Sequence, residues 1–199
     1  MPGFRELVST AMDLTVEPGS LLVAAPNMLD PNFMHAVVLV VQHSHEGAYG
    51  LVINRPAAIT LDVLLADHPI LSQQRFPVHA GGPVGLDTLQ FLQRVPEAVP
   101  GGSELGPGIV LGGDLDALAR YIEQDPARAQ HNVRMLLGYS GWGAKQLEAE
   151  LASGAWVPAP LQPDWAFDPD GQLVWRRVLR SLGSHAQGLE DLPPDVSWN

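Results

Sequence analysis

The stretch between Gly19 and Pro56 constrains the fold more than any other part of the chain. It contains three short apolar runs, dominated by Val, Leu and Ile, at residues 21–25, 36–41 and 51–53. Turn-forming residues (Pro, Asn, Asp and Gly) bound these runs. Short runs of this kind between turn residues are typical of strands that are covered on both faces. The stretch therefore predicts the hydrophobic centre of a sheet.

A polar segment at residues 43–47 joins the second run to the third. It has the length of a hairpin loop, and Gly47 is available there for a positive φ. His43 and His45 would share one face of a continuing strand, and with Glu46 they could begin a metal site. Such a site needs further ligands that the pattern does not supply. Polar residues that close a hairpin are therefore the preferred interpretation, and neither a metal nor a cofactor is predicted.

The rest of the chain alternates helical and strand patterns without an internal repeat. Helical spacing and capping residues predict helices at residues 4–14, 60–65, 115–124, 144–153 and 173–182. Short strand patterns predict strands at residues 76–80, 109–111 and 133–137, and the alternation of polar and apolar residues predicts a half-buried strand at 88–93. Pro and Gly predict an exposed loop at 95–108.

The composition limits the location and the chemistry of the chain. Its 199 residues suit one domain and can bury a core. The chain lacks cysteine, which excludes disulfides, a thiolate nucleophile and a zinc–thiolate site. No apolar run approaches the roughly 20 residues that span a bilayer, and the N-terminal segment lacks the apolar core of a secretory signal. We therefore expect a cytoplasmic protein that does not enter the membrane.

The charge balance argues against direct DNA binding. Asp and Glu total 22 against 11 Lys and Arg, which gives a formal net charge of −11. DNA phosphates are bound chiefly by clustered Lys and Arg. The densest basic cluster is Arg176, Arg177 and Arg180, and its place on a predicted helix is typical of a solvated helix face. A DNA-binding regulator is therefore the least favoured function.

Several ordered motifs carry a family resemblance. They are N-M-L-D-P-N-F from Asn27, H-S-H-E-G-A-Y-G-L-V-I-N-R-P from His43, G-G-P-V from Gly81, G-Y-S-G-W-G from Gly138, Q-L-E from Gln146 and A-W from Ala155. In this order they resemble the signature of the AlgH/YqgE family over most of the chain. The resemblance implies a single α+β domain with strands folded into a pseudo-barrel. It also implies a bacterial family of undefined molecular function, whose members are often labelled transcriptional regulators.

The chain departs from the family pattern after the G-G-P-V motif. Relatives carry an Arg-Gly-Phe element and a Leu-His pair there, whereas this chain places glutamines at Gln90 and Gln93. The segment after Gly183 also differs. A family function that needs the basic or imidazole group at these positions is not expected of this chain.

The expected architecture is one α+β domain over residues 1–183, followed by a C-terminal tail at residues 184–199. We expect a strongly twisted, partly closed sheet that is flanked by helices. Two subdomains divided at the 95–108 loop are the alternative.

The sequence around Ser140 invites comparison with a hydrolase. The pattern G-x-S-x-G exposes a nucleophilic serine between a strand and a helix, because its final glycine permits the tight turn. Gly138 and Ser140 match this pattern, but Trp142 takes the place of the final glycine. A helix cap or turn residue is thus the preferred interpretation of Ser140. A hydrolase that uses Ser140 or a histidine stays the alternative.

Arg55 is the most specific polar feature of the chain, because it ends an otherwise apolar strand. A guanidinium there can bind a carboxylate or phosphate through two hydrogen bonds, or it can form a structural ion pair with Asp30 or Asp62. We hypothesise a small cleft for an anionic ligand, in which Arg55 reaches a turn that contains Ser140, and Gly141 has a conformation closed to other residues. The cleft would be lined by Asn54, Arg55, Gly82, Ser140, Gly141 and Trp142.

These observations favour a non-catalytic regulatory or interaction protein, because no catalytic motif is complete. Its expected partners are a small anionic ligand or another protein. A hydrolase is the second interpretation and a direct DNA-binding regulator the third.

Overall fold

The computed structural model describes residues 15–182, so the helix expected at 4–14 and the tail expected at 184–199 lie outside the described residues. The strands are β1 (Leu21–Ala24), β2 (Val37–Ser44), β3 (Gly47–Val52), β4 (Pro56–Thr60), β5 (Pro77–Ala80), β6 (Val84–Gln93), β7 (Ser103–Gly106), β8 (Ile109–Leu111), β9 (Val133–Gly143) and β10 (Trp156–Ala159). The helices are α2 (Leu61–Leu64), the 3-10 helix η1 (Leu71–Gln73), α3 (Leu115–Gln124), α4 (Pro126–Gln130), α5 (Gln146–Ala152), α6 (Pro163–Ala166) and α7 (Gly171–Ser181).

The strands form one sheet with the order β10-β1-β2-β3-β9-β6-β8-β7, and β5 pairs with both β4 and β9. Neighbouring strands are antiparallel except for the parallel pair of β5 and β9. The α+β class and the single domain are confirmed. Among the described strands β10 and β7 do not pair with each other, so the sheet is open and the pseudo-barrel does not close.

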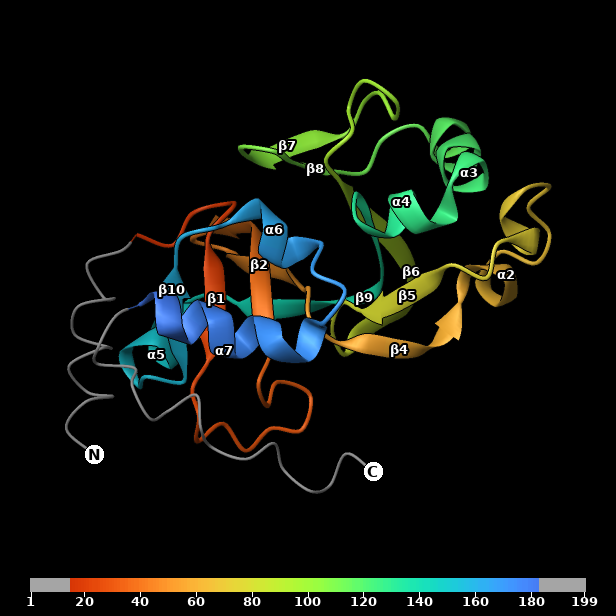
Figure 1. Ribbon diagram of the computed structural model, residues 1–199. Helices are drawn as coiled ribbons and strands as arrows, with labels where there is room; N and C mark the ends of the chain where they lie inside the picture. Colours follow the sequence, from red (N-terminus) through yellow and green to blue (C-terminus); the bar gives the residue numbers. More distant parts are fainter. Residues whose placement is uncertain (1–14, 183–199) are drawn as a thin grey trace.

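Three hydrophobic clusters fill the spaces between the sheet and its helices. The α7 cluster lies between β1–β3 and α6–α7, and Figure 1 shows α7 across β1 and β2. The α3 cluster lies where α2, α3 and α4 pack on β5, β6 and β9, and the α5 cluster lies beneath α5 on β1–β3. Their buried rings are Trp165, Phe167 and Trp175 in the α7 cluster, Phe76 and Phe91 in the α3 cluster, and Trp142 and Trp156 in the α5 cluster.

β9 holds the fold together as one domain. It supplies Leu136 to the α7 cluster, Met135 to the α3 cluster and Trp142 to the α5 cluster. A strand that is shared by all three clusters joins them into one body, and the two subdomains considered as an alternative are not separate.

Gly138 allows β9 to pair with strands in both halves of the sheet. Its φ is 73°, a left-handed conformation that costs glycine little, and the pairing with β6 shifts register at this point. Because of the shift, Leu136 and Tyr139 both pack against the α7 cluster, although an odd number of positions separates them. A Cβ at Gly138 would lie 2.6 Å from the Gly82 carbonyl oxygen, so no other residue fits without movement.

Most predicted elements are confirmed, and two expectations are wrong. The loop expected at 95–108 contains β7, which pairs with β8. The turn expected at 138–143 is the second half of β9, and α5 begins only at Gln146. At the helix starts, Asp114 accepts a hydrogen bond from the Ala117 N–H and caps α3, whereas the Thr60 side chain makes no cap at α2.

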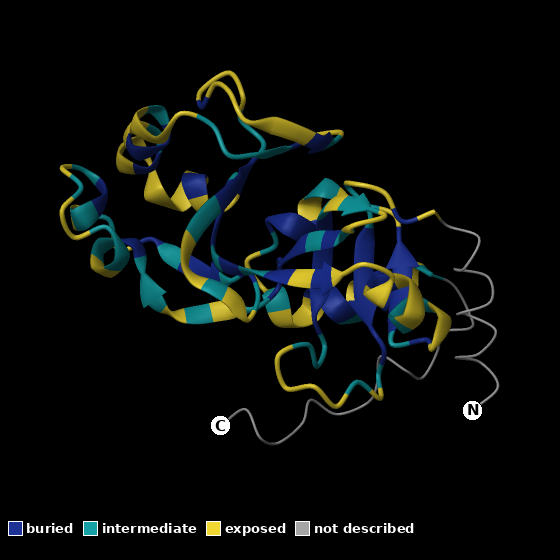
Figure 2. Cartoon of the chain, turned by 180° about the vertical axis from the view of Figure 1, so that it is seen from behind, coloured by how far each residue is buried: buried dark blue, intermediate teal, exposed yellow. Residues whose placement is uncertain are grey.

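No helix in the described range is long and apolar enough to span a membrane. Figure 2 shows that the strands under α7 and α5 are buried along most of their length, whereas the loop between β1 and β2 is exposed.

Candidate functional site

The loop between β1 and β2 is the candidate site, because the polar side chains predicted to be functional converge on its backbone. We call residues 25–36 the β1–β2 loop. Asn54 is buried, and its side chain accepts from the Val37 N–H at 2.8 Å and donates to the His35 carbonyl at 2.9 Å. The amide thereby fixes the point where the loop enters β2.

Arg55 holds the middle of the same loop. Its guanidinium donates to three backbone carbonyls, those of Pro31 at 3.2 Å, Met34 at 3.0 Å and Asn32. Burial lowers the pKa of Arg55, and the nearby Asp30 carboxylate opposes that shift. A guanidinium stays charged under these conditions, so the loop carbonyls receive charge-assisted hydrogen bonds.

Phe33 fixes the loop on one face of the sheet. Its ring stacks on Trp142 with 6.3 Å between centroids and meets Trp156 edge-on at 5.4 Å. The two indoles also meet edge-on at 5.9 Å. Aromatic pairs in these geometries contribute about 0.5–1.5 kcal/mol each beyond their burial. The loop is therefore packed into the α5 cluster by its own side chain.

The carboxylate of Glu150 on α5 orients both indoles. One oxygen, Oε2, accepts from the Trp142 indole N–H at 2.8 Å and from the Trp156 indole N–H at 2.7 Å. The other oxygen accepts from the Gln146 side chain at 2.9 Å, and Gln146 in turn accepts from the Gly143 N–H at 3.0 Å. This network ties α5, β9 and β10 together directly under Phe33.

His35 holds the loop on the opposite face of the sheet. Its ring centroid lies 4.3 Å from that of Trp175 on α7. Its φ is 56°, a left-handed conformation that is uncommon for a residue other than glycine. The β1–β2 loop thus crosses the end of the sheet and is held on both faces, by Phe33 on one and by His35 on the other.

The tip of the loop, at residues 27–32, precedes these two contacts and is largely exposed to solvent. Leu29 is 86% exposed, and Asn27, Asp30, Pro31 and Asn32 are exposed as well. The Asp30 side chain accepts from the Asn32 N–H at 2.8 Å, a local turn that stiffens the tip. A large apolar side chain is therefore presented to solvent by a loop whose base is fixed.

Gly82 and Ser140 form a separate contact within the sheet. Ser140 is fully buried, and its hydroxyl donates to the Gly81 carbonyl at 3.4 Å. A Cβ at Gly82 would lie 2.1 Å from the Tyr139 carbonyl carbon, so Gly82 permits close approach of two backbones. Gly82 thus lies against the Ser140 segment, whereas Asn54 and Arg55 both bind the β1–β2 loop. The Arg55 side chain points to the loop carbonyls.

Two sequence expectations around Ser140 are wrong. Ser140 is neither the helix cap nor the turn residue that was expected, because it lies inside β9 opposite Gly50, and this position also lacks the strand-to-helix turn of a nucleophile elbow. Gly141 is not in the left-handed region, and Gly138 is the glycine of β9 that is. Trp142 belongs to the support of Phe33 described above.

Two further histidines, His43 and His79, lie away from the loop. In the hairpin, His43 contacts Val16 and Glu148, and no group of three or more His, Cys, Asp or Glu in residues 15–182 could hold a metal ion. His79 is buried against Arg134, which is 3% exposed and also donates to the carbonyls of Ala166 at 2.9 Å and Asp168 at 2.7 Å. Within residues 15–182, neither His43 nor His79 makes a hydrogen bond with a serine.

A family model described as AlgH-like matches residues 21–187 of the chain. The chain belongs to the AlgH-like family. It is 36% identical over 168 residues to a UPF0301 protein of Chlorobaculum tepidum, across 84% of this chain and 88% of that protein. It is 39% identical over 182 residues to a UPF0301 protein of Anaeromyxobacter dehalogenans, across 86% of this chain and 90% of that protein.

Two solved structures share the AlgH-like fold. The solution structure of the AlgH protein from Pseudomonas aeruginosa superposes with a TM-score of 0.60 at 31% identity and covers 80% of this chain and 88% of that one. A crystal structure of a Corynebacterium diphtheriae protein gives a TM-score of 0.67 at 22% identity, with 89% and 91% covered, and supports the fold alone.

The AlgH-like motifs of this chain meet at the β1–β2 loop. The N-M-L-D-P-N-F motif is the loop itself, N-R-P supplies Asn54 and Arg55, and the G-W-G and A-W motifs supply the two indoles. Sequence reasoning missed Phe33 and Glu150 as members of the site. The signal for Phe33 was its place at the end of the first motif, whereas only the folded chain brings Glu150 to both indoles.

The departures from the AlgH-like pattern have structural roles here. The Gln90 side chain accepts from the Tyr49 hydroxyl. Gln93 is fully buried, donates to the Val99 carbonyl at 2.9 Å and accepts from the Val95 N–H at 2.8 Å. These glutamines hold β6 to β3 and to the segment that follows β6.

Proposed function

We propose that this AlgH-like chain is a non-catalytic interaction protein that binds a partner protein through the tip of its β1–β2 loop. One observation carries the proposal: Leu29 is 86% exposed on a loop that is held by Asn54, Arg55 and Phe33. A fixed loop loses little conformational entropy when it binds, and a central apolar side chain can supply much of the affinity. The burial of Ser140 supports the non-catalytic part of the proposal.

The partner that fits this tip has an apolar pocket with basic residues around it. Leu29 would fill the pocket, and Asp30 beside it carries a negative charge. The net charge of −11 for the whole chain favours approach of a basic surface, because long-range attraction speeds association.

Photo-crosslinking from the loop tip identifies the partner. A benzoylphenylalanine placed at position 29 is expected to capture one protein in the native cell, and the same group at position 86 serves as the control. Leu86 is a matched site because it is 66% exposed and lies on β6, outside the loop. Capture of the same proteins from both positions would count against the loop.

Binding of the purified partner then tests the role of Leu29 directly. Removing a leucine that fills a pocket costs about 2 kcal/mol, so Leu29→Ala should raise the Kd at least tenfold. Leu86→Ala should leave the Kd unchanged. An equal Kd for Leu29→Ala and the unaltered chain would refute the proposal.

A small anion is the second candidate partner, and one observation favours it. Arg55 lies at the base of an exposed loop and binds neutral carbonyls there, which an anion could replace as acceptors. Of the residues expected from the sequence, Asn54 and Arg55 lie at this loop and would bind the anion, whereas Gly82 and Ser140 form the separate contact within the sheet. A thermal-shift series with phosphate, acetate and nucleotides tests it, because a ligand of the folded chain raises the Tm. Arg55→Lys should abolish any such shift.

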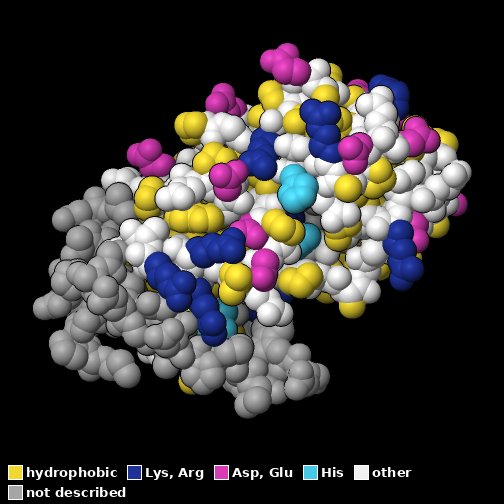
Figure 3. Space-filling model, viewed as in Figure 1, with side chains coloured by type: hydrophobic (Ala, Val, Ile, Leu, Met, Phe, Trp, Pro, Cys, Tyr) yellow, Lys and Arg dark blue, Asp and Glu magenta, His cyan; other side chains and the backbone are white. Residues whose placement is uncertain are grey.

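Direct DNA binding is not proposed. Figure 3 shows Lys and Arg side chains gathered over α7, and Arg177 of this group forms an ion pair with Asp168. The acidic net charge opposes a phosphate-binding surface.

A further inference from the structure

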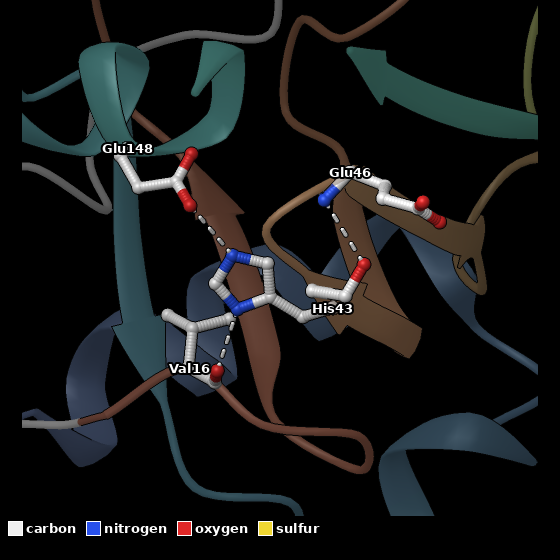
Figure 4. Close-up of polar contacts among 5 residues, drawn as sticks. Val16, His43, Glu46 and Glu148 are labelled. Atoms are coloured by element: carbon white, nitrogen blue, oxygen red, sulfur yellow. Dashed lines mark hydrogen bonds and ion pairs between the residues drawn. The ribbon is translucent and has the colours of Figure 1, made fainter. Parts of the chain in front are cut away.

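His43 bridges two acceptors that come from distant parts of the chain. Figure 4 shows its ring between the Val16 carbonyl, 2.8 Å from Nδ1, and the Glu148 carboxylate, 3.1 Å from Nε2. A carbonyl and an ionised carboxylate can only accept hydrogen bonds, so each ring nitrogen must carry a proton to satisfy both. The geometry therefore calls for the positively charged imidazolium. We call Val16, His43 and Glu148 the His43 bridge.

The bridge connects three elements. His43 lies near the end of β2, Val16 lies before β1, and Glu148 lies on α5. The hairpin next to it is stiffened by a hydrogen bond from the Glu46 N–H to the Ser44 hydroxyl at 3.2 Å (Figure 4). His43 is thus held by a short, fixed hairpin, and the two acceptors approach its ring from either side.

We infer that His43 forms a pH-sensitive contact, which holds α5 to the β2–β3 hairpin only while both of its ring nitrogens carry a proton. A neutral ring has one N–H, so one of the two acceptors faces a lone pair. The Val16 contact is the shorter one, and Val16 is buried, whereas half of the Glu148 side chain is exposed and can turn to water. Loss of the proton therefore releases Glu148.

The groups around the bridge determine whether the contact of His43 is lost at high pH or at low pH. Glu148 and Lys145 come from the α5 side, Glu17 follows Val16, and His45 and Glu46 lie on the hairpin. The Val16 carbonyl raises the pKa of His43 most, burial opposes it, and Glu148 raises it further. A raised pKa means that the contact is fully present below the ordinary value of 6.5 and is lost as the pH rises through the pKa of the folded chain.

Release of Glu148 should change the position of Glu150 and thereby the hydrogen bonds of the two indoles. Glu150 lies two positions further along α5 and accepts hydrogen bonds from Trp142 and Trp156. A helix of seven residues moves largely as one unit, so a weaker hold on Glu148 loosens the position of Glu150. The pH dependence of the His43 bridge does not depend on the proposed partner of the loop, and its test needs only the isolated chain.

Nuclear magnetic resonance of the full chain between pH 5 and 9 tests the inference. The His43 ring signals should titrate with a pKa above 6.5. Over the same transition, amide protection in α5, corrected for intrinsic exchange, should fall roughly two- to fivefold, the effect of one exposed charged contact. The indole N–H signals of Trp142 and Trp156 should shift with the same midpoint.

Three variants separate the bridge from general pH effects. His43→Gln should remove the transition from α5, and Glu148→Gln should lower the pKa of His43 towards its ordinary value. His45→Gln is the matched control, because His45 lies on the same hairpin and its side chain forms no hydrogen bond or ion pair within residues 15–182. A pKa of His43 at or below 6.5, or an α5 transition that persists in His43→Gln, would overturn the inference.

Discussion

The ring of Phe33 lies edge-on against the indole of Trp156, with 5.4 Å between their centroids. Phe33 precedes β2 and Trp156 begins β10, so the contact joins a loop to the strand at one border of the sheet. The loop backbone is held independently by Arg55, through carbonyls on both sides of Phe33. Beside Asn54 and His35, Phe33 and Arg55 thus provide two separate devices that fix the loop, and each can be tested by its own variant.

Removing the carboxylate of Glu150 tests the first device. Glu150→Ala leaves two largely buried indole N–H groups without an acceptor, and each such group costs about 1–3 kcal/mol. We expect the free energy of unfolding to fall by about 2–4 kcal/mol, measured by urea denaturation. Glu123→Ala is the control, because Glu123 is exposed on α3. Equal stability of the two variants would show that the indoles find other acceptors.

Removing the guanidinium of Arg55 tests the second device. Arg55→Ala deletes three hydrogen bonds to loop carbonyls and should lower the free energy of unfolding by about 1–3 kcal/mol. Amide exchange in residues 27–35 should rise further than exchange in the sheet. Arg55→Lys should recover only part of the loss, since an ammonium lacks the planar fork of donors. The exposed Arg75→Ala is the control, and a matching loss there would contradict this role.

The glycines of the chain offer a matched pair for the bend in β9. Gly138 and Gly112 have φ values of 73° and 75°, but a Cβ at Gly138 would lie 2.6 Å from the Gly82 carbonyl oxygen, whereas nothing lies within 4 Å at Gly112. Gly112→Ala should therefore cost about 1–2 kcal/mol of unfolding free energy, the left-handed backbone alone. Gly138→Ala should cost clearly more, and equal losses would mean that β9 and β6 can move apart.

Local sequence patterns predicted the centre of the sheet because β1 and the first half of β2 are apolar and buried on both faces. The run at 133–137 was recognised in this way, whereas residues 138–143 were interpreted as a turn because three of the six are glycine. Close approach of backbones explains Gly138, where a Cβ would lie 2.6 Å from the Gly82 carbonyl oxygen, but not Gly141 or Gly143, where the nearest atoms would lie 3.6 and 3.8 Å away. Close approach of two backbones depends on distant residues, and a local pattern does not contain it.

The candidate site was predicted in its residue types and not in its arrangement. Asn54 and Arg55 were singled out because polar residues at the end of an apolar strand are unusual, and Trp142 because an indole in a glycine turn could offer a stacking surface near Arg55. Their hydrogen bonds and ring contacts reach loop residues that lie about twenty or more positions away. An arginine at a strand end serves an anion or a loop carbonyl equally well, and only the folded chain shows the carbonyls of Pro31, Asn32 and Met34 in its reach.

The buried pair of His79 and Arg134 predicts sensitivity to acid. Burial first, and then the charge of Arg134, lower the pKa of His79 to about 3 from 6.5, against an opposing effect of the Met135 backbone. Burial also lowers the pKa of Arg134, to about 10, so the arginine keeps its charge at neutral pH. His79 is therefore neutral in the folded chain and accepts a hydrogen bond from Arg134.

Acidification should destabilise the chain through His79. Between pH 6.5 and 3 the unfolded chain binds a proton at His79 that the folded chain excludes, so the free energy of unfolding falls as the pH falls. One such group contributes a slope of at most about 1.4 kcal/mol per pH unit, measured by urea denaturation at pH 4 to 7. His79→Gln keeps an acceptor for Arg134 without titrating and should flatten the slope, whereas the exposed His131→Gln should not. The His43 bridge acts above pH 6.5 and in the opposite direction, so it cannot account for a loss of stability on acidification. If His79→Gln keeps the same slope as the unaltered chain, His79 is protonated in the fold and this prediction is wrong.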